Sequence, residues 1–215
     1  MRTVVIVSML AGRRGGAGCA LAVAAGLSLG VGACQLKPGE AQLGDQQVRL
    51  REAVEYAKQA QAAEQTGNKE EAIRLYQESA RAYRSFSASW NNLGALLMEQ
   101  GHNMEAIEAF KTAGEVSPTD PRPHTNIGFL WQKLGYLDDA AEAFSEALRR
   151  DRNYLPALRE SVLIDTQRDK VSEETADRVR RALLLETDES WKADLARRKT
   201  LVEQRLASQK DAPVR

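Results

Sequence analysis

Few side chains in this sequence have types and spacings suited to chemistry beyond binding. Its 215 residues include two histidines, His102 and His124, and two cysteines, Cys19 and Cys34. The histidines do not have the spacing of paired metal ligands on a helix, and the sequence has no glycine-rich phosphate loop and no serine nucleophile elbow. We therefore expect no enzyme activity, no catalytic residue, no bound metal and no cofactor.

The charged residues also favour a binding protein. The chain has 30 basic and 30 acidic side chains and a formal net charge of zero, so it lacks the broad positive surface that nucleic-acid binding needs. Carboxylates alternate with lysine and arginine, which is typical of solvated helix surfaces. We expect a protein that binds other molecules and does not bind nucleic acid.

The thiol of Cys34 is the one group whose surroundings indicate covalent modification. Arg13 and Arg14 precede an apolar run from Gly15 to Ala33, and residues 1–33 contain no acidic residue. This arrangement is typical of a secretory signal. The ending Val-Gly-Ala-Cys resembles the lipobox of bacterial lipoproteins. That resemblance implies a lipoprotein signal peptide at residues 1–33, cleavage before Cys34, and lipidation of Cys34 with acyl chains such as palmitate.

Other interpretations of this segment stay open. The run from Gly15 to Ala33 has 19 residues, close to the roughly 20 apolar residues that span a bilayer, although glycine and alanine make it weakly hydrophobic. An uncleaved anchor or an ordinary cleaved signal is therefore an alternative. Arg13 and Arg14 also resemble a twin-arginine signal, although small residues follow them where such signals usually carry a large apolar one. Translation could start at Met9 instead of Met1.

Cleavage before Cys34 would leave a mildly acidic chain with one cysteine. Residues 1–33 hold three arginines and no acids, so 27 basic and 30 acidic side chains would remain. A lone cysteine cannot form a disulfide within the chain or a zinc site that needs two thiols. Residues 34–45 contain Pro38, Gly39 and Gly44, and we expect them to form a flexible tether.

A repeat with a period of 34 residues organises the middle of the chain. Four columns of small or aromatic residues keep this interval without a gap: Gly67, Gly101 and Gly135; Ala72, Ala106 and Ala140; Tyr76, Phe110 and Phe144; Ala60, Gly94 and Gly128. Helix-forming residues dominate, so each unit is predicted to be two antiparallel helices. Gly94 and Ala106 leave room for the two helices to approach closely, and Gly101 suits a left-handed turn.

The repeat at residues 87–120 resembles the tetratricopeptide repeat family. It carries the family's residue types at the family's offsets: Trp90, Leu93, Gly94, Leu97, Gly101, Ala106, Phe110, Ala113 and Pro118. The repeat at 121–154 departs from the pattern at His124 and Arg152, and the repeat at 53–86 is the loosest. The resemblance implies an all-α, right-handed α-solenoid of three helix pairs that binds proteins on its concave face.

The period fails after Tyr154. The apolar residues of 155–166 predict a capping helix that completes a repeat domain at 46–168. Ser172 and Thr187-Asp188-Glu189 predict two further helix starts. We expect a C-terminal helical hairpin within 169–208 and a disordered tail at 209–215. A partner-binding coiled coil is an alternative for the last helix, although it offers scarcely two heptads.

The resemblance places the candidate binding groove on the first helix of each pair, and the helix that follows the third pair extends it. Nine residues are the candidates: Asn91, Asn92, Met98, Arg122, Asn126, Phe129, Lys133, Arg159 and Leu163. The asparagine amides can donate to and accept from a peptide backbone, the cations can receive a carboxylate, and the apolar side chains can form a pocket. For each asparagine, a structural hydrogen bond between adjacent helices is an equal alternative.

One subset of the family binds a C-terminal carboxylate through a clamp of Lys, Asn, Asn, Lys and Arg. The matching positions in this chain are Ala57, Gln61, Asn92, Arg122 and Asn126. Most of the clamp's charges are missing. The sequence therefore argues against a receptor for chaperone tails.

These observations together predict a membrane-anchored scaffold of the cell envelope. We expect its anchor, the lipidated Cys34, to hold it on the periplasmic face of the outer membrane, which we favour over the inner membrane. Its groove would bind a peptide or helix of a partner protein during assembly of a pilus, secretion or cell-wall enzyme complex. The alternative is a carrier or regulator that binds a small molecule or glycan in the groove. The oligomeric state stays open.

Overall fold

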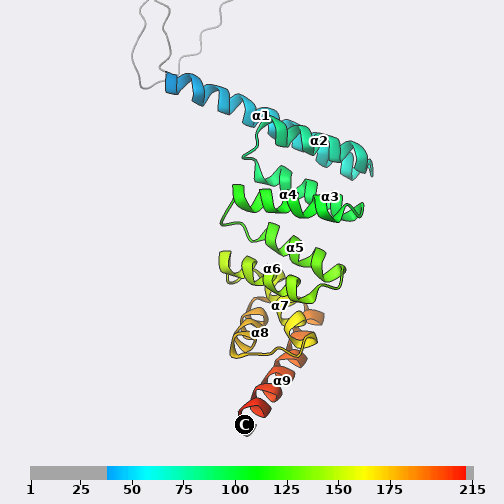
Figure 1. Cartoon of the computed structure of the whole chain (residues 1–215), viewed down its shortest axis with the longest axis vertical. Coiled ribbons are helices and arrows are strands. Elements are labelled where there is room, and N and C mark those ends of the chain that lie inside the picture. The colour runs from blue at the N-terminus through cyan, green and yellow to red at the C-terminus, as the bar shows by residue number, and fades with distance from the viewer. Residues whose placement is uncertain (1–37, 212–215) are drawn as a thin grey trace, which may run out of the picture. The chain divides into compact units, whose positions relative to one another are not determined.

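A computed structural model describes residues 38–211, where nine α-helices follow one another and no strand occurs (Figure 1). Their bounds are α1 Pro38–Gln65, α2 Lys69–Ala82, α3 Ser87–Glu99, α4 Asn103–Val116, α5 Arg122–Lys133, α6 Leu137–Arg150, α7 Leu155–Gln167, α8 Glu173–Leu185 and α9 Glu189–Asp211. The predicted all-α solenoid of helix pairs is confirmed. The signal segment and Cys34 lie outside the described residues. None of the described helices is long and apolar enough to span a bilayer.

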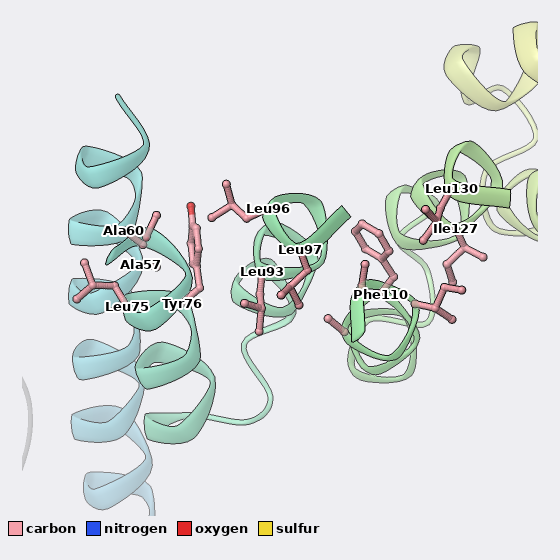
Figure 2. Close-up of a cluster of buried hydrophobic side chains, with 14 of the residues drawn as sticks. Ala57, Ala60, Leu75, Tyr76, Leu93, Leu96, Leu97, Phe110, Ile127 and Leu130 are labelled. Atoms are coloured by element: carbon pink, nitrogen blue, oxygen red, sulfur yellow. The ribbon is translucent and has the colours of Figure 1, made fainter. Parts of the chain in front are cut away.

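Successive helices form antiparallel pairs, α1 with α2, α3 with α4 and α5 with α6, and each pair packs on the next. The first helices α3 and α5 also touch each other. Figure 2 shows the buried side chains that join these pairs, from Ala57 and Ala60 on α1 to Ile127 and Leu130 on α5. The core therefore continues from one pair to the next, as expected for an array in which a single pair cannot bury its own apolar surface.

The close approach of paired helices depends on the glycine column. A Cβ atom at Gly94 would lie 2.7 Å from Cδ1 of Phe110, and one at Gly128 would lie 2.6 Å from Cε1 of Phe144. Both phenylalanine rings are fully buried. Each ring on a second helix therefore occupies the space that its partner glycine leaves free, as the sequence predicted.

The same turn joins two consecutive helices at four places in residues 38–211. The sequence pattern predicted three of them. Gly67, Gly101 and Gly135 have φ of 77°, 83° and 84°, and Asp169, which follows at the same interval, has φ of 55°. In each turn the next residue donates its backbone N–H to the carbonyl five residues back: Asn68 to Ala63, His102 to Leu97, Tyr136 to Trp131, and Lys170 to Asp165. Helices α7 and α8 therefore form a fourth helix–turn–helix unit.

The fourth unit escaped detection because none of the four columns keeps its residue type at the next interval of 34, where Val162, Asp169, Glu174 and Arg178 stand. Val162 stands 34 residues after Gly128 and is fully buried. Helix α8 contains no aromatic residue, so no ring needs the space that a glycine would leave. The α7–α8 turn is also two residues longer than the others, since α8 begins at Glu173 whereas α6 begins at Leu137.

Helix α9 takes the place of a fifth first helix. It begins at Glu189, 34 residues after α7 begins at Leu155, and it contacts both α7 and α8. Both predicted helix starts are confirmed, because Ser172 forms a capping box with Thr175, and Asp188 Oδ1 accepts from the N–H of Trp191 at 2.9 Å.

The predicted tether at 34–45 and the predicted tail at 209–215 are wrong in the parts that the structure describes, and residues 34–37 and 212–215 lie outside the described residues. Helix α1 begins at Pro38, so residues 38–45 are helical rather than a flexible tether. Proline suits the first turn of a helix because that turn needs no N–H donor. Helix α9 continues to Asp211, so residues 209–211 do not belong to a disordered tail. Side chains of residues 42–52 on α1 are all exposed, including Leu43 and Val48.

Candidate binding groove

The predicted groove residues lie on the first helices α3, α5 and α7, which form a face that we call the first-helix face. Two hydrogen bonds link asparagines of this face to neighbouring helices. Asn126 Nδ2 on α5 donates to Asn91 Oδ1 on α3 at 3.0 Å, and Asn92 Nδ2 donates to Tyr76 Oη on α2 at 3.1 Å. These contacts are the hydrogen bonds between adjacent helices that were the alternative to peptide binding. Each amide can still form further hydrogen bonds as a donor and as an acceptor.

Two of the three predicted cations already have carboxylate partners. Arg122 Nη2 lies 2.7 Å from Asp120 Oδ2. Arg159 pairs with Glu186, and its Cζ atom lies 4.7 Å from the ring centroid of Trp191. Lys133 is exposed and forms no ion pair with any side chain of residues 42–210. Lys133 is therefore the predicted cation best placed to meet a ligand.

The predicted apolar residues are half-buried. The Phe129 ring packs edge-on against Phe144, with 5.5 Å between the centroids. Met98 packs against the buried cluster that contains Leu93, Leu96 and Leu97. Leu163 lines a hollow between α7 and α9. Met98 and Phe129 thus support the core, and all three side chains leave part of their surface exposed.

Two hollows mark the ends of this face. The first, between α1 and α3, measures about 150 Å³ and is lined by Gln61, Glu64, Tyr76, Asn92, Ala95, Leu96 and Glu99. We call it the acidic hollow. The second, between α7 and α9, measures about 360 Å³ and is lined by Leu163, Ser190, Trp191, Asp194, Arg197 and Arg198. We call it the tryptophan hollow.

The α9 residues of the tryptophan hollow were missed by the sequence analysis, which assigned the last helix to a C-terminal hairpin. The interval of 34 residues between the starts of α7 and α9 is the signal that could have found them. Once α9 is recognised as a fifth first helix, its residues belong to the same face as Leu163.

Titratable groups around the face are held in defined states. Burial, together with the Glu64 carboxylate, raises the pKa of Tyr76, so its phenol stays protonated at neutral pH. Burial alone would raise the pKa of Glu186, but the Arg159 guanidinium and the N–H groups of Asp188 and Thr187 lower it below its ordinary value. Glu186 therefore stays ionised, and its charge fixes Arg159 beneath Trp191.

A cavity larger than either hollow lies elsewhere. It measures about 510 Å³ and is lined by residues of α2 and α4 and by Trp90, Leu93 and Leu97 of α3. These residues lie on a different side of α3 from Asn91 and Asn92. Size alone would favour this cavity, but none of the nine predicted groove residues lines it.

The histidines differ in environment. His102 is exposed at the start of α4. His124 is half-buried, and burial together with Arg150 and Arg149 lowers its pKa to about 4. Across residues 38–211, no group of three or more His, Cys, Asp or Glu side chains is arranged to hold a metal ion. The described surface thus offers shape, hydrogen bonds and charge for binding.

Comparisons with known proteins agree with this geometry. The tetratricopeptide repeat family model matches residues 87–120. A photosystem I assembly protein, Ycf3, of Synechococcus sp. (strain CC9605) is 25% identical over 118 residues, which cover 47% of this chain and 68% of that protein. The STIP1 homolog of Dictyostelium discoideum is 33% identical over 91 residues, covering 39% of this chain and 16% of that protein.

Two solved structures share the fold. The first TPR of Spaghetti (RPAP3), bound to the HSP90 peptide SRMEEVD, superposes with a TM-score of 0.52 at 16% identity, covering 56% of this chain and 95% of that one. MamA superposes with a TM-score of 0.50 at 14% identity, covering 71% of this chain and 97% of that one. The described helices therefore form a tetratricopeptide-type solenoid.

Proposed function

We propose that this tetratricopeptide repeat protein is a scaffold that holds an extended segment of a partner protein along its first-helix face. The observation that carries the proposal is the arrangement of that face. Hollows mark its two ends, and between them lie the amides of Asn91 and Asn126, the exposed Lys133 and the half-buried Phe129. The related fold of RPAP3 in complex with a peptide supports the idea that such a face accepts an extended chain.

Lys133 and Asn92 are the residues to change in a test, because both reach the face without filling the core. Phe129 is left intact, since its ring packs on Phe144. We expect the full chain to capture a partner from a membrane extract, and the double variant Asn92→Ala/Lys133→Glu to bind that purified partner at least about tenfold more weakly. The melting temperature of the double variant should fall by only a few degrees, in line with partly exposed substitutions.

The matched control is Met104→Ala on α4, which removes an exposed side chain from the large cavity on the other side of α3. This control should retain full affinity. Equal affinity of wild type and the double variant would place the binding site on another surface. Capture of no protein by the full chain would contradict the scaffold and favour the small-molecule or glycan alternative.

We further propose that the protein is lipid-anchored through Cys34 on the periplasmic face of an outer membrane, where it supports assembly of an envelope machine. The support is the charged and apolar segment that ends in Val-Gly-Ala-Cys. Cys34→Ser should release the protein from membranes and abolish palmitate incorporation, whereas Cys19→Ser should change neither. Membrane retention of the Cys34→Ser protein would favour an uncleaved anchor.

A further inference from the structure

We infer that the partner segment is recognised by opposite chemistry at its two ends, with a basic side chain in the acidic hollow and an apolar side chain followed by an acidic one at the tryptophan hollow. This inference rests on the proposed function, because it describes the segment that the first-helix face would hold. It specifies the composition of that segment and the spacing of its key residues.

The acidic hollow has the lining that a cation requires. Two carboxylates, Glu64 and Glu99, stand at its rim, and no basic side chain lines it. The Glu99 carboxylate already holds an ammonium group, since Lys69 Nζ lies 2.7 Å from Glu99 Oε2. Both partners of that pair are about half exposed, at 47% for Lys69 and 51% for Glu99. A lysine or arginine of the partner can therefore reach the same carboxylates from solvent.

The acidic hollow is also lined by two neutral hydrogen-bonding groups, the phenol of Tyr76 and the amide of Asn92. Tyr76 Oη accepts a hydrogen bond from Asn92 Nδ2 at 3.1 Å, and its own proton stays in place because its pKa is raised. The hollow measures about 150 Å³, which suits one side chain rather than a folded element. The site thus matches a single basic residue of an extended segment.

The tryptophan hollow has an apolar wall and a cationic rim. Leu163 and Trp191 form the wall, and the Trp191 ring is held in place by Arg159, which is itself paired with the buried Glu186. At the rim, Arg197 is 74% exposed and lies 3.2 Å from Asp194, which also pairs with Arg198.

Two guanidinium groups thus share one carboxylate at this rim, which leaves a net positive charge. The fork of donors on a guanidinium suits a carboxylate ligand. An apolar side chain against Trp191, followed by an acidic residue at Arg197, fits these groups.

The repeat geometry sets the distance between the two ends. The acidic hollow lies between the first and second of the first helices, and the tryptophan hollow lies between the fourth and fifth. Packed helix axes are roughly 8–10 Å apart, so three steps span roughly 24–30 Å. An extended chain covers about 3.3 Å per residue. The basic residue and the apolar–acidic pair should therefore be roughly seven to nine residues apart.

A phage-displayed library of random 16-residue peptides, selected on the full chain in detergent, tests this composition directly. We expect enriched peptides to carry a basic residue and an apolar–acidic pair at that spacing. Fluorescence anisotropy of one such labelled peptide should show about twofold to fivefold weaker binding to Glu64→Lys and to Arg197→Glu, as expected for loss of exposed charge pairs. Changing the peptide's basic residue to glutamate should restore binding to Glu64→Lys.

The control variant is Glu105→Lys on α4, which makes the same change in net charge away from the first-helix face. It should bind the wild-type peptide with unchanged affinity. Enrichment of peptides without the charge pattern, or equal affinity of wild type, Glu64→Lys and Arg197→Glu, would overturn this inference and leave groove binding intact. Enrichment of no peptide would instead contradict the proposed function itself.

Discussion

The guanidinium of Arg159 on α7 lies over the indole ring of Trp191 on α9, with 4.7 Å between Cζ and the ring centroid. Glu186, in the loop between α8 and α9, pairs with the same guanidinium and is almost fully buried. One arginine therefore joins the fourth helix pair to the last helix and positions the ring of the tryptophan hollow.

Replacing Glu186 with glutamine should destabilise the protein at neutral pH and matter less in acid. The folded-state pKa of Glu186 lies below its ordinary value of 4.5. Its ionised form therefore contributes stability above pH 4.5, and that contribution is lost as pH falls through the lowered folded pKa. Urea midpoints at pH 7, 4.5 and 3 should show a gap between wild type and Glu186→Gln that narrows with acidity.

The control for this measurement is Glu189→Gln, which removes an exposed carboxylate near the start of α9. We expect it to stay within about 0.5 kcal/mol of wild type at neutral pH, as is usual for surface changes. A Glu186→Gln gap that is the same at pH 7 and pH 3 would contradict the role assigned to the ionised carboxylate.

Gly94→Ala should destabilise the protein because the new Cβ would lie 2.7 Å from the buried Phe110 ring. Overpacking of this kind typically costs about 1–3 kcal/mol, which thermal or urea unfolding would measure. Gly44→Ala is the matched control, since a Cβ at this exposed position of α1 meets nothing within 4 Å. That change should stabilise helix α1 by about 0.5–1 kcal/mol. Equal effects of the two substitutions would refute the packing argument.

Asp169→Gly should raise stability, whereas Gly135→Ala should lower it. Both residues have positive φ, 55° at Asp169 and 84° at Gly135, and only glycine adopts this region without strain. The expected size is about 1 kcal/mol in each direction, measured by urea unfolding. Loss of the exposed ion pair between Asp169 and Arg205 offsets little. Asp169→Asn, which removes the charge and keeps local hydrogen bonding, separates the two contributions.

His124 should make the protein less stable in mild acid. Burial, with Arg150 and Arg149, lowers its pKa from 6.5 to about 4. The unfolded chain therefore binds a proton between these values that the folded chain does not, so the free energy of unfolding falls as pH drops from 6.5 to 4. His124→Phe removes the titrating group. Its urea midpoint should fall less than that of wild type between pH 6.5 and 4, and parallel falls would show that other groups cause the loss.

The sequence was sufficient for the fold where one residue type is physically required. Gly94 faces Phe110 and Gly101 has positive φ, so these columns persist and reveal three helix pairs. The fourth pair has Val162 and Asp169 in place of glycines. Its backbone has the same shape as the other pairs, but its side chains differ from theirs. A search for repeated residue types therefore cannot find the fourth pair.

The groove could be predicted as a face but not residue by residue. Spacing placed Asn91 on the first helix of a pair, and it placed Arg159 and Leu163 on the helix that follows the third pair. The structure has these residues on α3 and α7. Arg122 and Arg159 are already paired with Asp120 and Glu186. These two carboxylates lie in loops, and the repeat pattern does not predict loop geometry. The binding roles themselves stay predictions.

Because helices of this array contact mainly their neighbours in the chain, its ends and its middle should open independently. The side chains of residues 42–52 of α1 are exposed, so opening this part of the helix breaks few buried contacts. Its amide hydrogens should therefore exchange with solvent first. Helices α3 to α6 are flanked on both sides and should exchange last. A partner that reaches from the acidic hollow to the tryptophan hollow would connect both ends, so its binding would be visible as slower exchange across the whole array.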